Sequence, residues 1–264
     1  MATTIRFISF ADEKLKPTLR RIGKEAKQSG FFDEIHLLNE KSFEREYLKR
    51  YRQWYADNPR GYGYWIWKPY FIRKELRTLK DGDVLVYLDA GCVINASAKE
   101  RFCQYIMQLS ESQLIICFDH ISCLNEQYTK TDLIKYFSFN DEPLFLQSRQ
   151  FMGAILVLRK CGKTLRFVDE WYDICHNYQN LVDDSPSLLP ESEKFIEHRH
   201  DQSVFTCLCW KYGIKALSQI EVYPKGGDWS TMMSFPFWAK RNKEYRKSTI
   251  WVRLINRLKR LLKN

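Results

Sequence analysis

The feature that most constrains this chain is a run of five consecutive apolar residues, Val84 to Leu88 (VLVYL), which ends directly in a carboxylate, Asp89. A strand with one solvated face would alternate apolar and polar residues, so an unbroken run indicates a strand buried on both faces. Such a strand belongs to the middle of a sheet that helices cover on both sides. The rest of the chain must therefore supply further strands and enough helices to cover them.

The remaining sequence supplies this alternation of strands and helices. Its 264 residues suit one α/β domain with a full core. Apolar runs predict the strands, and periodic stretches bounded by Asp, Pro or Gly predict the helices. Strands are expected at 5–11, 34–38, 113–118 and 151–158, and helices at 12–29, 41–55, 69–79, 98–109, 163–178 and 201–212. We predict an α/β fold with a mostly parallel sheet.

Asp89 and Gly91 mark the first candidate site. Ligands of such sheets bind at the carboxyl ends of the strands, where the phosphates of a nucleotide or their metal would lie. An equally good interpretation is an aspartate that begins a turn, with Gly91 as the turn residue. Two other acidic pairs are set aside. The D-G-D at 81–83 precedes the strand and points away from the ligand edge, and the pair at 183–184 is expected to be solvated.

The second candidate site is the segment 60–69 (RGYGYWIWKP). Its two glycines allow close approach of the backbone, and Tyr64 and Trp67 offer faces on which a base can stack. Lys68 adds a cation near the start of a helix, where a diphosphate can be held. The alternative is an aromatic core with a flexible turn, and most of these rings are expected to pack in the interior.

The third candidate site is the segment 198–202 (HRHDQ). In an extended stretch His198 and His200 face the same way, and Asp201 begins a helix. The alternative is a capped helix preceded by surface histidines. Without other context, that alternative is the stronger interpretation.

Together these segments resemble the bacterial glycosyltransferases of the GT-A fold that build surface polysaccharides such as lipopolysaccharide, O-antigen and capsule. The resemblance covers residues 1 to about 240 and rests on YLDAG after the buried strand, GYGYWIWKP, FMGAILVLRK and HDQSVF. The order of the segments is also similar to that of the glycogenin-like retaining glycosyltransferases. The resemblance implies a Rossmann-like mixed sheet, a nucleotide-sugar donor, a glycan or lipid-linked acceptor, and transfer of a hexose.

The resemblance also assigns roles to single residues. Asp89 matches the first acid of the D-x-D that anchors the metal and the donor diphosphate, and Gly91 stands where the second acid should be. Gly153 matches the glycine of the acceptor-side strand, with Gln150 near it. Asp201 and Gln202 match the pair beside the transferred sugar. This last likeness makes them the catalytic candidates and favours a retaining reaction.

The incomplete D-x-D leaves the cofactor open. A divalent cation, Mn²⁺ or Mg²⁺, is the usual means of offsetting the charge of a leaving diphosphate. With Gly91 in place of an acid, Asp89 would hold this ion with His200 or Asp201, together with waters and phosphate oxygens. Otherwise Lys68 or an arginine must supply the charge. We expect a metal.

The positive charge of the chain is concentrated at its C-terminus. From Lys240 onwards there are ten Lys or Arg and one Glu, so this segment carries +9 of the net +10. Residues 250–262 place Ile, Trp and Leu on one helical face, which is typical of a helix lying on an anionic membrane surface. We therefore divide the chain into a catalytic domain, 1–240, and a basic amphipathic tail, 241–264, in which Arg241 can still face the donor. A helix docked on the domain is the alternative.

The near-neutral body argues against other functions. A module that binds nucleic acid or another acidic polymer would spread its charge over the fold, so no nucleic-acid partner is expected. A nucleotidyltransferase would carry a Gly-rich phosphate loop after the first strand, and residues 10–13 (FADE) lack one. The eight cysteines show no C-x-x-C pair, and no run approaches the ~20 apolar residues of a spanning helix. We expect a cytoplasmic enzyme, peripheral at the inner face of the cell membrane.

Overall fold

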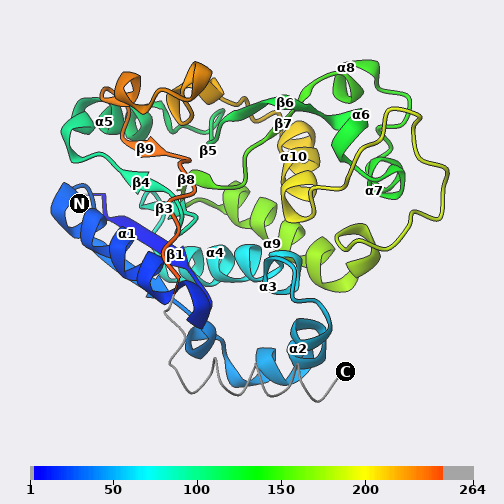
Figure 1. Cartoon of the computed structure of the whole chain (residues 1–264), viewed down its shortest axis with the longest axis horizontal. Helices are drawn as coiled ribbons and strands as arrows, with labels where there is room; N and C mark the ends of the chain where they lie inside the picture. The colour runs from blue at the N-terminus through cyan, green and yellow to red at the C-terminus, as the bar shows by residue number, and fades with distance from the viewer. Residues whose placement is uncertain (1–2, 246–264) are drawn as a thin grey trace, which may run out of the picture.

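The structure, a computed structural model, describes residues 3–245 as a central sheet with helices on both faces (Figure 1). The five strands have the order β2-β1-β3-β8-β5. They are β1 (Ile5–Phe10), β2 (Glu34–Leu38), β3 (Val84–Leu88), β5 (Ile115–Ile116) and β8 (Ile155–Arg159). Four of them run in one direction and β8 runs against them. The predicted α/β fold with a mostly parallel mixed sheet is confirmed.

Strand β3 lies at the centre of the sheet, and none of its residues is more than 2% exposed. Side chains alternate along a strand, so Leu85 and Tyr87 enter the core on one face while Val84, Val86 and Leu88 enter the core on the other. The first face is covered by α4 (Trp67–Thr78), α9 (Gly162–Asn177) and α10 (Asp201–Tyr212), and the second by α1 (Lys16–Ser29) and α5 (Lys99–Gln108). Because a core covers each face of β3, all five of its residues are apolar.

The sequence pattern merged two strands that the structure separates. The apolar run at 151–158 predicted one strand, whereas β7 (Arg149–Phe151) ends before Gly153 and β8 begins after it. β7 pairs with β6 (Asp119–Leu124) in a separate ribbon, while β8 pairs antiparallel with β3. This reversal brings the first residues of β8 to the carboxyl end of β3, where the Asp89 amide donates to the Ala154 carbonyl at 2.8 Å.

The helices agree with the predicted pattern, with small shifts at their ends. Gly30 adopts the left-handed conformation (φ 64°) that ends α1, as a glycine at this position favours. The predicted helix at 41–55 begins later, as α2 (Arg45–Asp57). Helix α10 begins and ends where it was predicted.

A smaller lobe extends from the sheet on the side of β5 (green and yellow in Figure 1). It contains the β6–β7 ribbon and the loop-rich stretch 182–200 before α10. Three short helices complete it: α6 (Asn125–Tyr128), α7 (Thr131–Tyr136) and α8 (Pro143–Leu146).

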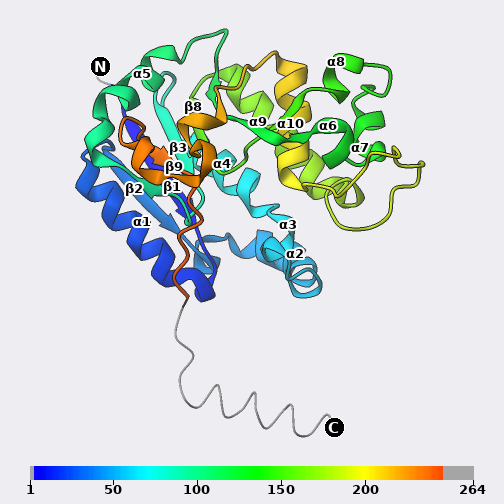
Figure 2. The ribbon, with the colours of Figure 1, turned by 45° about the horizontal axis from the view of Figure 1, so that its top comes forward.

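The last described residues return to the sheet. β9 (Phe237–Trp238), labelled in Figure 2, pairs antiparallel with β4 (Val93–Ile94), which follows β3 in the chain and is labelled in Figure 1. The chain then continues across the carboxyl end of β3. Residues 246–264, which include most of the predicted amphipathic tail, lie outside the described residues, so that helix stays a prediction. Among the helices within residues 3–245, none is both long and apolar enough to cross a membrane.

Candidate active site

A buried lysine joins the three segments that the sequence singled out. Lys68, in the first turn of α4, places its Nζ 3.0 Å from Oδ2 of Asp201 and 3.7 Å from Oδ1 of Asp89. The Lys68 side chain is 4% exposed and that of Asp201 is 5% exposed. Two carboxylates and one ammonium leave this cluster with one net negative charge.

Electrostatics keep this cluster ionised near neutral pH. Burial alone would lower the pKa of Lys68, but the attraction of Asp201 and Asp89 outweighs it and raises that pKa. Burial raises the pKa of Asp201 to about 6, against the opposing effect of Lys68. An ammonium with a raised pKa beside a carboxyl of pKa about 6 is an ion pair above pH 6.

Asp89 satisfies both interpretations of its sequence. Its carbonyl accepts from the Cys92 amide at 2.8 Å, which closes the turn that Gly91 was expected to permit. Its carboxylate accepts from the Tyr87 hydroxyl and faces Lys68, with 38% of the side chain exposed. The carboxylate therefore lies at the ligand edge of the sheet while the backbone makes the turn.

Gly153 is required by how closely the cluster packs. A Cβ at this position would lie 3.3 Å from Nζ of Lys68 and 3.7 Å from Oδ2 of Asp201. Its amide donates weakly, at 3.4 Å, to Oε1 of Gln202. Gln202 donates in turn to Oε1 of Gln150 at 2.8 Å. Gln150 is fully buried and also donates to Ser203, so it supports Gln202 from below and does not face the cavity.

The aromatic segment before Lys68 forms an unusual turn. α3 (Gly61–Tyr64) and the next residue, Trp65, all have positive φ, which makes this a left-handed turn. Such a turn is costly for residues with a Cβ, and a Cβ at position 61 would lie 2.4 Å from the Trp65 ring. The turn directs Trp65 into the cavity. Strain of this kind concentrates at functional sites.

The two aromatic residues predicted to bind the donor lie elsewhere. Trp67 is 6% exposed, packs on Phe10 and donates to the Gly61 carbonyl at 3.0 Å. The Tyr64 ring packs against that of His200, with centroids 4.9 Å apart. Neither residue lines the cavity. Of the aromatic residues of this segment, Trp65 is the one that lines the cavity, and the sequence pattern did not distinguish it from its neighbours.

The histidines are buried, so the interpretation of surface histidines is wrong. His198 and His200 are 4% and 3% exposed, and they bond to the successive carbonyls of Leu181 and Val182. Burial lowers the pKa of both rings, so both are neutral at pH 7. The backbone at His200 is not extended (φ 52°) but turns sharply into α10.

The acidic pair at 183–184 is not simply solvated, as the sequence had suggested. Asp183 accepts from the buried Lys130 at 3.2 Å. Asp184 is paired with Arg60 at 2.8 Å and lies 3.7 Å from His200. The excluded pair at 81–83 does lie at the opposite end of β3, where Asp83 accepts from the Thr4 amide. The loop residues were misjudged because their partners are distant in sequence.

The cluster does not fit a divalent metal. The ammonium of Lys68 occupies the space between the two carboxylates, and Gly91 offers no oxygen from a side chain. Nδ1 of His200 is engaged by the Val182 carbonyl, and its Nε2 faces Asp184. Across residues 3–245, no three His, Cys, Asp or Glu side chains gather closely enough to hold an ion. The expected metal at Asp89 and His200 stays untested.

The cluster forms one wall of an open cavity of about 630 Å³. This volume suits a nucleotide-sugar, which is larger than a nucleotide alone. The charged side chains that line the cavity are those of Arg60, Lys68, Arg199, Arg241 and Lys243, and of Asp89, Glu197 and Asp201. Five cations against three carboxylates give a lining charge of +2. Three of these cations were assigned no role from the sequence. Arg60 and Arg199 lie within the candidate segments, and Lys243 lies outside them.

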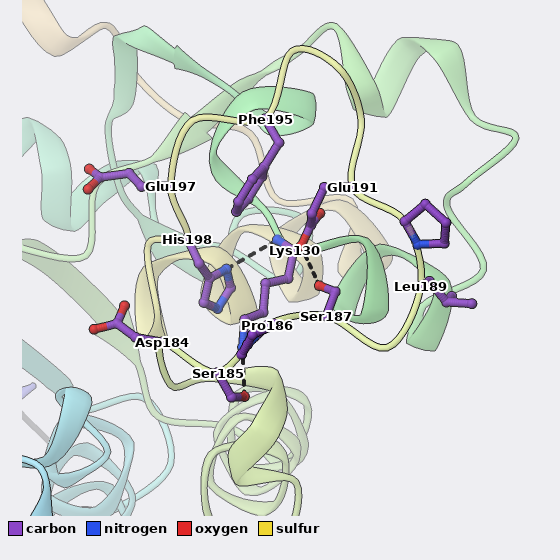
Figure 3. Close-up of a pocket in the computed structure, with 11 residues that line it drawn as sticks. Lys130, Asp184, Ser185, Pro186, Ser187, Leu189, Glu191, Phe195, Glu197 and His198 are labelled. Carbon is purple, nitrogen blue, oxygen red and sulfur yellow. Dashed lines mark hydrogen bonds between the residues drawn. The ribbon is translucent and has the colours of Figure 1, made fainter.

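A second cavity, of about 510 Å³, lies under the loop 184–198 (Figure 3). Lys130 crosses it, and the Phe195 ring and the Glu191 carboxylate lie close by. Its three acidic residues, Asp184, Glu191 and Glu197, outnumber its single cation. Glu197 lines both cavities, so the two adjoin.

No protein-family model and no curated protein matches the sequence. Three solved structures with a similar arrangement are glycosyltransferases. One, involved in glycosylation of the major capsid of PBCV-1, is 9% identical, with 90% of this chain and 97% of that chain covered and a TM-score of 0.47. The galactosyltransferase LgtC is 13% identical, with 83% and 75% covered and a TM-score of 0.46. The bifunctional WbbM is 11% identical, with 89% and 44% covered and a TM-score of 0.48. Likeness this distant assigns no function, which must rest on the site itself.

Proposed function

We propose that this protein is a glycosyltransferase that moves a hexose from a nucleotide-sugar donor to a saccharide acceptor. The observation that carries the proposal is the cluster of Lys68 with Asp89 and Asp201, at the carboxyl end of β3, on the wall of a cavity with net positive lining. Ligands of α/β sheets bind at this edge. A positively charged lining suits a diphosphate. The carboxylates suit a sugar, because they can accept hydrogen bonds from its hydroxyl groups.

We place the diphosphate and the base of the donor at one end of the cavity and its sugar at the other. The exposed cations Arg241 and Lys243 suit the diphosphate, and Trp65 offers a face to the base. Asp201 and Gln202 pack against Gly153, where the absence of a side chain lets them approach Lys68, and this end of the cavity suits the sugar. Gln150 holds the Gln202 amide in place from below.

We further propose that the reaction retains the configuration of the anomeric carbon. An inverting reaction needs a carboxylate that is free to take the proton of the acceptor hydroxyl. Lys68 engages both carboxylates of the cluster, and Tyr87 also donates to Asp89. In a retaining reaction the leaving diphosphate takes that proton, so these carboxylates can remain paired throughout.

For the acceptor we propose a lipid-linked or polysaccharide glycan of the bacterial cell surface, reached at the inner face of the membrane. This part rests on the basic, one-sided apolar sequence of residues 246–264. Deleting these residues should abolish sedimentation with vesicles that contain anionic lipid and spare transfer to a short soluble saccharide. A truncated enzyme that still sediments would contradict the membrane role.

The test of function is a transfer assay with UDP-, GDP- and CDP-hexoses, read by NMR of the anomeric proton of the product. We expect one donor to be used, and an α-linked donor to give an α-linked product. Asp201→Asn should reduce transfer by about a thousandfold, since it removes the partner of Lys68 at the sugar. Asp81→Asn, a carboxylate paired with Lys160 at the opposite end of β3, is the matched control and should change nothing. If Asp201→Asn transferred the hexose at the wild-type rate, the assignment of Asp201 to the active site would be refuted.

A further inference from the structure

The chain passes over Gly91 on its way out of the domain. We call residues 239–245 the strap. The Asn242 amide donates to the Gly91 carbonyl at 2.8 Å, and the Ala239 amide donates to the Val222 carbonyl at 2.7 Å. Thr18 of α1 bonds to both backbone groups of Glu244 at 2.7 Å. The strap is therefore fixed at its start, middle and end.

Arg21 of α1 fastens the middle of the strap to the turn after β3. Its Nη2 donates to the carbonyls of Ala90, Cys92 and Asn242, at 2.8, 2.9 and 3.1 Å. Glu25 holds the same guanidinium at 2.6 Å. One side chain from a helix thus ties two backbone segments together.

The strap explains why residue 91 is a glycine. A Cβ at this position would lie 3.3 Å from the Cα of Arg241, which is tighter than ordinary contact. The strap therefore occupies the space into which an acidic side chain would extend. The strap also carries strain, because Arg241 has φ 52°, a left-handed conformation that is unusual for a residue with a Cβ. The bonds on either side of Arg241 hold it there.

The strap brings two cations to the cavity that the rest of the fold leaves unpaired. Within residues 3–245, neither Arg241 nor Lys243 has a carboxylate partner, while Arg60 and Arg199 each pair with an acid. Both line the cavity on the side of Gly91, and both are exposed. Unpaired cations beside a buried ammonium form a site for an anion of high charge.

We infer that the chain's own cations, Lys68 together with Arg241 and Lys243 of the strap, offset the charge of the donor diphosphate in place of a divalent metal. The inference rests on the proposed function, since it names how that same site holds its donor. During transfer the bond from the sugar to the diphosphate breaks, and its electron pair goes to the phosphate oxygen. The acceptor oxygen bonds to the sugar, and its proton passes to the diphosphate. The fixed cations face the charge that grows in this step.

The test measures binding of UDP and of GDP by calorimetry, once with EDTA and once with Mn²⁺. We expect one nucleotide to bind at least as tightly with EDTA as with Mn²⁺. Arg241→Gln and Lys243→Gln should each weaken that binding by about tenfold, because each removes a charge-assisted contact. Lys240→Gln is the matched control: it removes the same charge from the strap, but its ammonium lies over the rings of Trp229 and Trp238, away from the cavity. The Lys240→Gln variant should bind the nucleotide with the affinity of the wild type.

A second measurement follows the metal itself, by the electron paramagnetic resonance signal of free Mn²⁺. Adding the protein to a mixture of Mn²⁺ and the bound nucleotide should not lower this signal below the value set by the nucleotide alone. Binding that requires Mn²⁺, or variants of Arg241 and Lys243 that bind like the wild type, would overturn the inference and leave the glycosyltransferase assignment standing. A protein that binds neither nucleotide in either condition would overturn both.

Discussion

The two adjoining cavities have opposite charge, although they share Glu197. The cavity at β3 is lined by five cations and three carboxylates, and the loop cavity by one cation and three carboxylates. Their lining charges are therefore +2 and −2. A diphosphate is attracted to the first and repelled by the second.

The buried lysines of the two cavities also differ in how they are held. Lys130 donates to the Asn180 carbonyl at 2.8 Å, to Asp183 at 3.2 Å and to Ser185 at 3.3 Å, so all three of its protons are used. Within residues 3–245 the ion-pair partners of Lys68 are two carboxylates, and one of them, Asp89, is partly open to the cavity. Two similarly buried lysines thus differ in surroundings: Lys130 fixes a loop, and Lys68 lines the cavity at β3.

The largest effect is expected from Lys68→Met. This change leaves Asp89 and Asp201 facing each other without a cation, so the site repels a diphosphate. Transfer should fall by at least about a thousandfold, measured in single-turnover assays on protein shown to be folded by circular dichroism. Lys160→Met, at the opposite end of β3, is the control. Transfer within about threefold of wild type would remove Lys68 from the site.

Lys130→Met should lower the stability of the protein and leave nucleotide binding unchanged. The loop before α10 loses three hydrogen bonds, and Asp183 keeps enough exposure to be solvated, so the free energy of unfolding should fall by about 2–3 kcal/mol. Urea denaturation measures this loss. Nucleotide affinity of the folded variant should stay within about threefold of wild type. If Lys130→Met reduced transfer as much as Lys68→Met does, the two lysines would not differ in role.

The pH dependence of transfer tests whether the cluster at β3 acts as an ion pair. The pKa of Asp201 is about 6 in the folded protein, above the ~4 of an unfolded aspartate. Transfer should therefore drop about tenfold for each pH unit below 6, and Asp201→Asn should lack this inflection. Between pH ~4 and ~6 only the folded state keeps this proton, so Asp201 makes the protein less stable as pH rises through that window. A rate independent of pH from 5 to 7 would contradict the ion pair.

The smallest effect is expected from Gly91→Ala. The new Cβ presses on the Arg241 backbone at 3.3 Å, and the strap must shift by a few tenths of an ångström. Nucleotide affinity should fall by a few-fold, which is under ~1 kcal/mol. Gly162→Ala, where a Cβ would meet only the end of the Arg166 side chain at 3.7 Å, is the control. Equal affinity in both variants would show that the strap position does not tune the site.

Local sequence predicted most of the fold and part of the site. The run at 84–88 indicated a strand between two cores, and the structure places it there. The start of α10 at Asp201 was also predicted, and Lys68 was expected near the start of the helix that contains Pro69, since a proline is tolerated in the first turn of a helix. These features depend on neighbours along the chain, which the sequence displays directly.

Tertiary structure alone decided how these pieces meet. The reversal of β8 puts Ala154 beside Asp89, and α9, which packs against both α4 and α10, brings Lys68 to Asp201. The strap adds Arg241, whose approach leaves Gly91 no space for a side chain. Periodicity reveals which face of an element is buried, but not which distant element covers it. Local sequence therefore indicates the elements and their chemical groups, whereas long-range packing brings some of those groups together in one cavity.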